Sequence, residues 1–119
     1  MARYLVQASY TADAWAAMVE HPEDRSISVR RMVQHAGGHL ECFYLAFGEH
    51  DVVTILDVPD NIAAASVSMA AAAGGGLRSI RTTPLLTPEE ALAAMGKART
   101  VEYTAPGQPA EVHTPIPAG

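Results

Sequence analysis

The sequence predicts an α+β fold of the ferredoxin-like type, in which the order β-α-β-β-α-β gives one antiparallel four-stranded sheet, followed here by an added C-terminal helix. Three observations predict this class. Short runs rich in β-branched and aromatic residues alternate with segments of helical periodicity. Two of those runs are separated only by a short turn at residues 48–51, as in a hairpin. Polar capping residues precede the helical segments.

The first part of the chain predicts a strand and two helical pieces. Residues 4–10 are rich in β-formers and predict the first strand. Thr11 is expected to cap a helix that has Asp13 in its first turn. Pro22 interrupts this helix, and a second helical piece follows it until Gly37, where glycine permits a left-handed C-cap. The apolar residues of the first helix share one face: Trp15, Met18 and Val19.

The remaining elements follow from strong stop signals. The hairpin strands are expected over residues 39–47 and from about residue 51 to 58, where Pro59 ends the second strand. Asp60 or Asn61 caps a helix that continues to residue 73 and is broken by the glycines at 74–76.

A fourth strand is expected over residues 77–83. Thr87, Pro88 and Glu90 then form a typical helix start for a last helix that ends near residue 97. We therefore expect one domain over residues 1–98 and a Pro-rich tail, extended or disordered, over 99–119.

Both faces of the hairpin are apolar. A hairpin with one face in water should instead alternate apolar and polar residues. Simple alternation assigns one set to the helix side: Leu40, Cys42, Tyr44 and Ala46. It assigns the other set to the opposite side: His39, Glu41, Phe43, Leu45 and Phe47. The three large apolar residues of the second set would form an unusually large exposed patch on a monomer. We therefore expect a homodimer in which two sheets pack face to face.

Several short stretches, spread over roughly residues 3–97, carry a resemblance to a known family: Ser9-Tyr10-Thr11, residues 15–19 and 22–25, Gly37-Gly38, residues 43–48 with Asp51, Pro59-Asp60-Asn61, and residues 82–87. On these stretches the chain resembles the GYD domain family, which is named for a Gly-x-Tyr-Asp-like turn. The tyrosine of that pattern is His50 here, so a tyrosine mechanism does not carry over to this position. The resemblance implies a dimeric α+β barrel, a fold shared by cofactor-free oxygenases, isomerases and small-molecule binders. It implies no settled activity.

Composition excludes several classes of function. The net charge is -5 and Lys and Arg total only 8, which argues against a nucleic-acid partner. Cys42 is the single cysteine, so the chain has no internal disulfide framework, and we expect it to pack inertly in the core. No apolar run is long enough to predict a membrane span or a secretory signal, and the expected location is the cytoplasm.

His50 and Asp51 are the candidate catalytic pair, because a histidine with a pKa near neutrality can act as acid or base. The simpler interpretation is that His50 is a turn residue and Asp51 binds backbone amides. His35 and His39 have a spacing that would suit a metal on one helix, but two glycines lie between them. We therefore predict no metal and no cofactor.

Tyr10, Trp15 and Tyr44 are the candidate ligand-binding residues, which would line a pocket between the sheet and the helices. Trp15 has the simpler alternative of a core anchor. Two functions remain open. The first is an oligomeric domain that binds a small apolar or aromatic metabolite. The second is a cofactor-independent isomerase or oxygenase that uses a histidine as acid-base.

Overall fold

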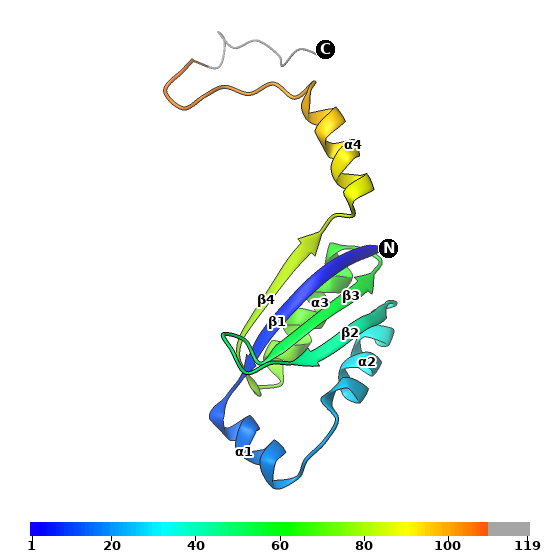
Figure 1. Cartoon of the computed structure of the whole chain (residues 1–119), viewed down its shortest axis with the longest axis vertical. Helices are drawn as coiled ribbons and strands as arrows, with labels where there is room; N and C mark the ends of the chain where they lie inside the picture. The colour runs from blue at the N-terminus through cyan, green and yellow to red at the C-terminus, as the bar shows by residue number, and fades with distance from the viewer. Residues whose placement is uncertain (110–119) are drawn as a thin grey trace. The chain divides into compact units, whose positions relative to one another are not determined.

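The computed structural model describes residues 1–109. The chain divides into two compact units, Met1–Leu85 and Leu86–Gly119. The first unit contains a four-stranded sheet and three helices, and the second contains the last helix (Figure 1). The predicted Pro-rich tail, 99–119, falls only partly within the described residues, because 110–119 lie outside them.

The strands form one antiparallel sheet in the order β2-β3-β1-β4. Their bounds are Ala2–Tyr10 for β1, His39–Leu45 for β2, Val52–Val58 for β3 and Leu77–Leu85 for β4. β4 is an edge strand, and this position tolerates Pro84, which has no amide to donate. Together with the element order, this topology confirms the predicted ferredoxin-like α+β class.

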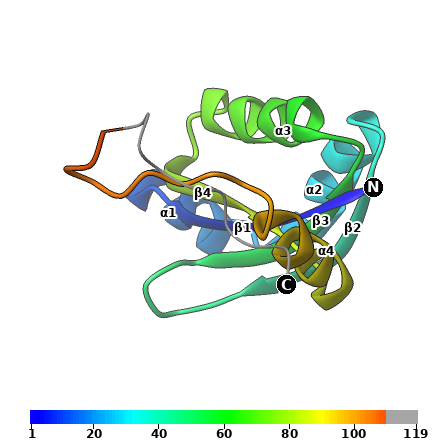
Figure 2. The same cartoon turned by 90° about the horizontal axis from the view of Figure 1, so that it is seen from above.

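Three helices accompany the sheet in the first unit, and Figure 2 shows α3 as a layer above it. Their bounds are Ala12–Glu20 for α1, Arg25–His35 for α2 and Asn61–Ala73 for α3. Each begins after a residue whose side chain accepts a hydrogen bond from a helix amide: Thr11, Asp24 and Asp60. Hydrogen bonds from the hydroxyl and the amide of Ser26 lower the pKa of the Asp24 carboxyl.

The core lies between the sheet and the helices. Every second side chain of β1 and β3 faces this layer and is buried: Tyr4, Val6, Ala8, Val52, Thr54, Leu56 and Val58. Val33 of α2 and Val67 of α3 pack against them from the helical side. The phenol of Tyr4 donates a hydrogen bond to Asn61 at the start of α3, which fixes that end of the helix to the sheet.

A β-bulge at Glu41 changes the faces of the hairpin. Leu40 lies opposite Leu56, but Cys42 lies opposite Ile55, so Glu41 is an extra residue in β2. Beyond the bulge, Phe43 faces the helices and packs with the core, whereas Cys42 and Tyr44 lie on the opposite face. The predicted alternation was therefore wrong beyond residue 41, because one inserted residue inverts every later side chain.

The hairpin loop is also longer than predicted. β2 ends at Leu45 and β3 begins at Val52, so Ala46 and Phe47 belong to the loop and not to the strand. Leu45 lies opposite Val52, and its side chain is more than half exposed. Phe47 is fully exposed in the loop. The patch that the sequence predicted from Phe43, Leu45 and Phe47 is therefore divided among the core, the strand end and the loop.

Two glycines connect α2 to β2 for different physical reasons. Gly37 has a φ of 87°, and the amides of Gly37 and Gly38 bond to the carbonyls of Gln34 and Val33. This is a Schellman motif, and it confirms the predicted left-handed cap at Gly37. Gly38 instead allows the backbone of β3 to approach closely, since a Cβ at Gly38 would lie 2.3 Å from the carbonyl oxygen of Asp57.

The second unit contains helix α4, Pro88–Ala98, which has the predicted capping box. The amide of Glu90 donates to the Thr87 hydroxyl, and the Glu90 carboxylate accepts from the Thr87 amide. The apolar side chains of Leu92 and Met95 are exposed on this helix.

The two glycines should differ in how much stability they lose on substitution. Gly37→Ala should lower the free energy of unfolding by about 1 kcal/mol, because alanine is strained at positive φ. Gly38→Ala should cost more, about 2–3 kcal/mol, because the backbone of β3 must move. Gly48→Ala is the matched control, since a Cβ there meets nothing within 4 Å. Urea denaturation measures all three, and equal losses would contradict this account.

Candidate functional site

A cavity of about 450 Å³ lies between the sheet and the helices. Its floor comes from all four strands and includes Val6, Phe43, Thr54 and Ile80. Its walls come from α1, α2 and α3, with Met18, Val29 and Ala71 as examples. Most of its lining side chains are apolar. This is the composition expected of a site that receives a small apolar molecule.

The cavity exists because α2 and α3 are not packed tightly against each other. A groove with a volume of about 460 Å³ runs between them and is lined by Arg31 and His35 from α2 and by Ser66 from α3. The groove shares four lining residues with the cavity: Ser28, Met32, Val67 and Ala70. Alanine dominates the sequence of α3, so that helix projects too little side-chain volume to fill the space.

The part of the cavity wall formed by residues 1–109 has three ionisable side chains, and they interact with one another. Arg25, in the first turn of α2, forms an ion pair with Glu23 at 3.4 Å between Nη1 and Oε2. Burial raises the pKa of the Tyr10 phenol above its ordinary value, and the neighbouring Arg25 opposes that shift. The charge of Glu23 acts on the same phenol and favours its protonated form. Tyr10 is therefore a neutral hydroxyl at physiological pH.

Asp51 fixes the end of β1 against α1. Its carboxylate oxygen Oδ2 accepts hydrogen bonds from the Tyr10 amide at 2.9 Å and from the Trp15 indole nitrogen at 3.1 Å. Its own amide donates to the carbonyl of Ala8 at 2.8 Å. The Trp15 ring meets the Tyr10 ring edge-on, with centroids 5.3 Å apart. The interpretation of Asp51 as a residue that binds backbone amides matches this geometry.

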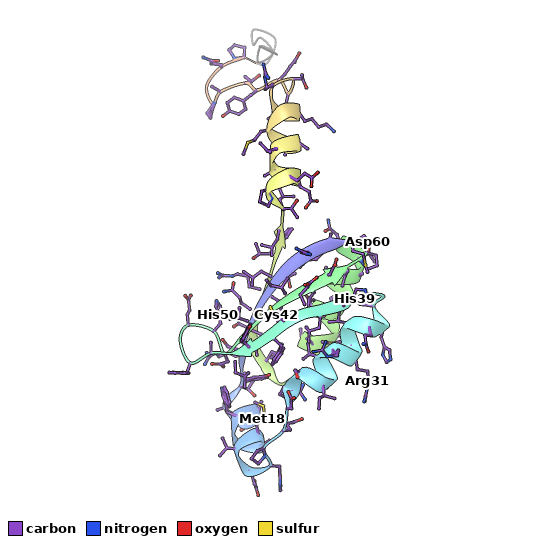
Figure 3. All side chains as sticks on the ribbon, turned by 45° about the vertical axis from the view of Figure 1, so that its right-hand side comes forward. Met18, Arg31, His39, Cys42, His50 and Asp60 are labelled. Atoms are coloured by element: carbon purple, nitrogen blue, oxygen red, sulfur yellow. The ribbon has the colours of Figure 1, made fainter. Side chains whose placement is uncertain are left out.

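His50 lies in the hairpin loop, where Figure 3 labels it. Its Nδ1 atom is shielded from solvent and has no hydrogen-bond partner among residues 1–109. The part of the cavity wall formed by these residues contains no histidine. The structure therefore separates His50 from the cavity, and its catalytic role stays a prediction.

The predicted ligand-binding residues have three different positions. Tyr10 lines the cavity. Trp15 is not a lining residue, and it contacts the Tyr10 ring and the Asp51 carboxylate. Tyr44 lies on the opposite face of the sheet, where its side chain is 66% exposed. Its predicted place between sheet and helices was wrong because of the bulge at Glu41.

Sequence reasoning missed Arg25 and Phe43 as cavity residues. Arg25 follows the N-cap Asp24, and this capping signal places its side chain in the first turn of α2 beside the end of β1. The sequence contains that signal, although the interaction with Tyr10 depends on the fold. Phe43 enters the cavity floor only because of the bulge, for which the sequence has no comparable signal.

His35 and His39, whose spacing was considered for a metal and judged unsuitable, are separated in the fold. His35 lies in the last turn of α2 and lines the groove, whereas His39 is exposed at the start of β2 (Figure 3). Among residues 1–109, no group of three or more His, Cys, Asp or Glu side chains is arranged to hold a metal ion. Over the same residues, no helix has both the length and the hydropathy needed to cross a bilayer.

Comparison with known proteins identifies the family. The sequence model of the GYD domain matches residues 4–95, more than three quarters of the chain. The chain belongs to the GYD domain family. This confirms the resemblance found in its short motifs, and the matched span includes every residue of the cavity wall described above. A search of curated proteins found no match, so the function of this GYD domain must be argued from the cavity itself.

Asp51 should be required for stability. Asp51→Ala leaves the Tyr10 amide and the Trp15 indole without their acceptor, which should cost about 2–3 kcal/mol of unfolding free energy. Asp51→Asn retains one carbonyl acceptor and should cost less. Tryptophan fluorescence followed through urea denaturation measures both effects. Glu49→Ala, an exposed acidic residue of the same loop, is the control. An Asp51→Ala variant as stable as this control would show that the hydrogen bonds contribute nothing.

Proposed function

We propose that this GYD domain binds a small apolar or aromatic molecule in the cavity between its sheet and its helices. The observation that carries the proposal is the cavity itself, whose volume of about 450 Å³ falls in the range of small-molecule sites. Its wall is mainly apolar, with a few polar groups gathered where Tyr10 and Arg25 meet. Such a combination provides both contact area and orientation for a ligand.

The cavity is too large to be a sealed packing void. Protein interiors are close-packed, and their voids seldom exceed the size of a water molecule. At roughly 24 cal/mol per Å³, a sealed void of 450 Å³ would cost about 11 kcal/mol, as much as the whole stability of a typical domain. The space is therefore an open site, filled by solvent or by a ligand.

The enzyme alternative has less support. It requires a histidine that acts on a bound substrate, whereas the four histidines among residues 1–109 do not line the cavity. A binding function uses the groups that are present, namely an apolar wall, a neutral phenol and a guanidinium. We therefore favour binding over an isomerase or oxygenase reaction.

We also propose that two copies associate through the sheet face opposite the helices. That face has an apolar centre, in which Leu5, Val53 and Ile55 are half-buried within one chain and Tyr44 is exposed. The ion pair between Arg3 and Glu41, 3.7 Å long, lies beside this centre. An apolar centre with a polar rim is typical of an interface.

Filling the cavity should weaken ligand binding. Ala71 of α3 lines the cavity, so Ala71→Phe should weaken the binding of Nile red, a neutral apolar dye, by about tenfold or more, because its ring occupies the ligand's space. Fluorescence titration measures the affinity. Ala72→Phe is the matched control, since Ala72 is exposed on the same helix.

Equal dye binding by the wild type and both variants would place the dye elsewhere and contradict the proposal. Native mass spectrometry of the protein from its own host adds an independent test, because a retained small molecule should be present in the wild type and absent from Ala71→Phe.

The proposed interface should be sensitive to a charge at its centre. Ile55→Lys would bring two lysines together across a twofold axis. The dissociation constant of the dimer should therefore rise by at least about a hundredfold. Sedimentation equilibrium measures the association. Ile62→Lys, on the exposed side of α3, is the control and should leave it unchanged. A wild-type protein that sediments as a monomer at micromolar concentration would refute the interface.

A further inference from the structure

The polar groups of the cavity are unevenly distributed. Among the lining residues that belong to the described part of the chain, 1–109, only Tyr10, Glu23 and Arg25 are ionisable, and the three side chains interact with one another. The lining hydroxyls are already engaged, since Thr54 Oγ1 donates to the carbonyl of Cys42 and Ser28 Oγ donates to the carbonyl of Arg25. The cavity therefore has one polar end, and the rest of its wall provides apolar contact.

Of the two charged side chains at this end, Arg25 is the less exposed to solvent. Its side chain is 34% exposed, whereas that of Glu23 is 52% exposed. The contact between them is a single long one, with 3.4 Å between Nη1 and Oε2. Exposed ion pairs of this kind contribute little to stability, so a better acceptor can replace Glu23 at little cost. A guanidinium has five N–H donors and binds a carboxylate with two of them at once.

Tyr10 adds a second donor beside Arg25. Burial raises the pKa of its phenol, so the hydroxyl keeps its proton at physiological pH. The Tyr10 backbone is held by Asp51, and its ring is held by Trp15. Two donors, one of them positively charged, match a ligand whose polar end accepts hydrogen bonds and is negatively charged.

We propose that the ligand of this cavity is an amphipathic monocarboxylate, whose carboxylate binds Arg25 and Tyr10 and whose apolar body occupies the space beneath α1, α2 and α3. This inference rests on the proposed binding function and adds the chemical class of the ligand. Glu23 has a secondary part: it neutralises Arg25 while the site is empty and moves away when the carboxylate binds.

The test compares ligands that differ only in the head group. Octanoate, octanamide and octylamine share an aliphatic body, and 2-naphthoate and 2-naphthamide share an aromatic one. Calorimetry should give at least one of the two carboxylates an affinity about tenfold or more above that of its amide, because a charge-assisted bidentate contact is lost in the amide. Octylamine should bind more weakly than octanamide, since it places a cation beside Arg25.

Variants separate the head group from the cavity. Arg25→Gln should weaken the carboxylate by about tenfold or more and change the amide by less than about twofold. Arg25→Lys keeps the charge without the planar fork and should have an intermediate affinity. Glu23→Gln should strengthen carboxylate binding by a few-fold, because it removes the competing anion. Arg30→Gln is the matched control on an exposed residue of α2, and thermal melting checks that every variant is folded.

The outcomes distinguish the two proposals. If the amides bind as tightly as the carboxylates, or if Arg25→Gln weakens both equally, the anionic head group is wrong and the binding function stands. The anionic head group is also wrong, and the binding function stands, if Nile red binds and neither carboxylate does. If no probe binds, or if Ala71→Phe affects none of them, both proposals fail.

Discussion

The structure depends on how the inner face of the sheet is covered. A four-stranded sheet with apolar residues on one face must bury that face, and here α2 packs over β2 while α3 packs over β4 and β3. Neither helix fills the middle, because Pro22 separates the first helical segment into α1 and α2 and because α3 is built mainly of alanine. The burial that makes the fold stable is therefore concentrated around Leu56 and Val58. The cavity occupies the part that the helices leave uncovered.

Different residues position the site and contact the proposed ligand. Asp51 accepts hydrogen bonds from the Tyr10 amide and the Trp15 indole, so it fixes the end of β1 and α1 together. Tyr10 and Arg25 then present their polar atoms to the cavity. A binding group held on a strand end by a partly buried hydrogen-bonding partner loses little freedom when it binds, which is the usual advantage of a pre-organised site.

The bulge at Glu41 links the two faces of the sheet. It turns Phe43 inward, where it contributes to the cavity floor, and it turns Cys42 and Tyr44 outward, where they join Val53 and Ile55. A single extra residue therefore shapes both the proposed ligand site and the proposed interface. This coupling follows from the two-residue period of a strand, in which a shift of one position moves a side chain to the other face.

The sequence by itself determined the class of fold, the order of its elements and most of their ends, because capping residues, glycines and prolines act locally. Thr11, Thr87 and Gly37 each specify a helix end through contacts within a few residues, and the family motifs have the same local character. Tyr10 was one of three aromatic residues that the sequence offered as candidates, and it is the one of the three that lines the cavity. The faces of the hairpin, the contact of Arg25 with Tyr10 and the position of His50 outside the cavity wall were decided only by the tertiary structure. Each depends on strand register or on packing between segments distant in sequence, where no local preference distinguishes the alternatives.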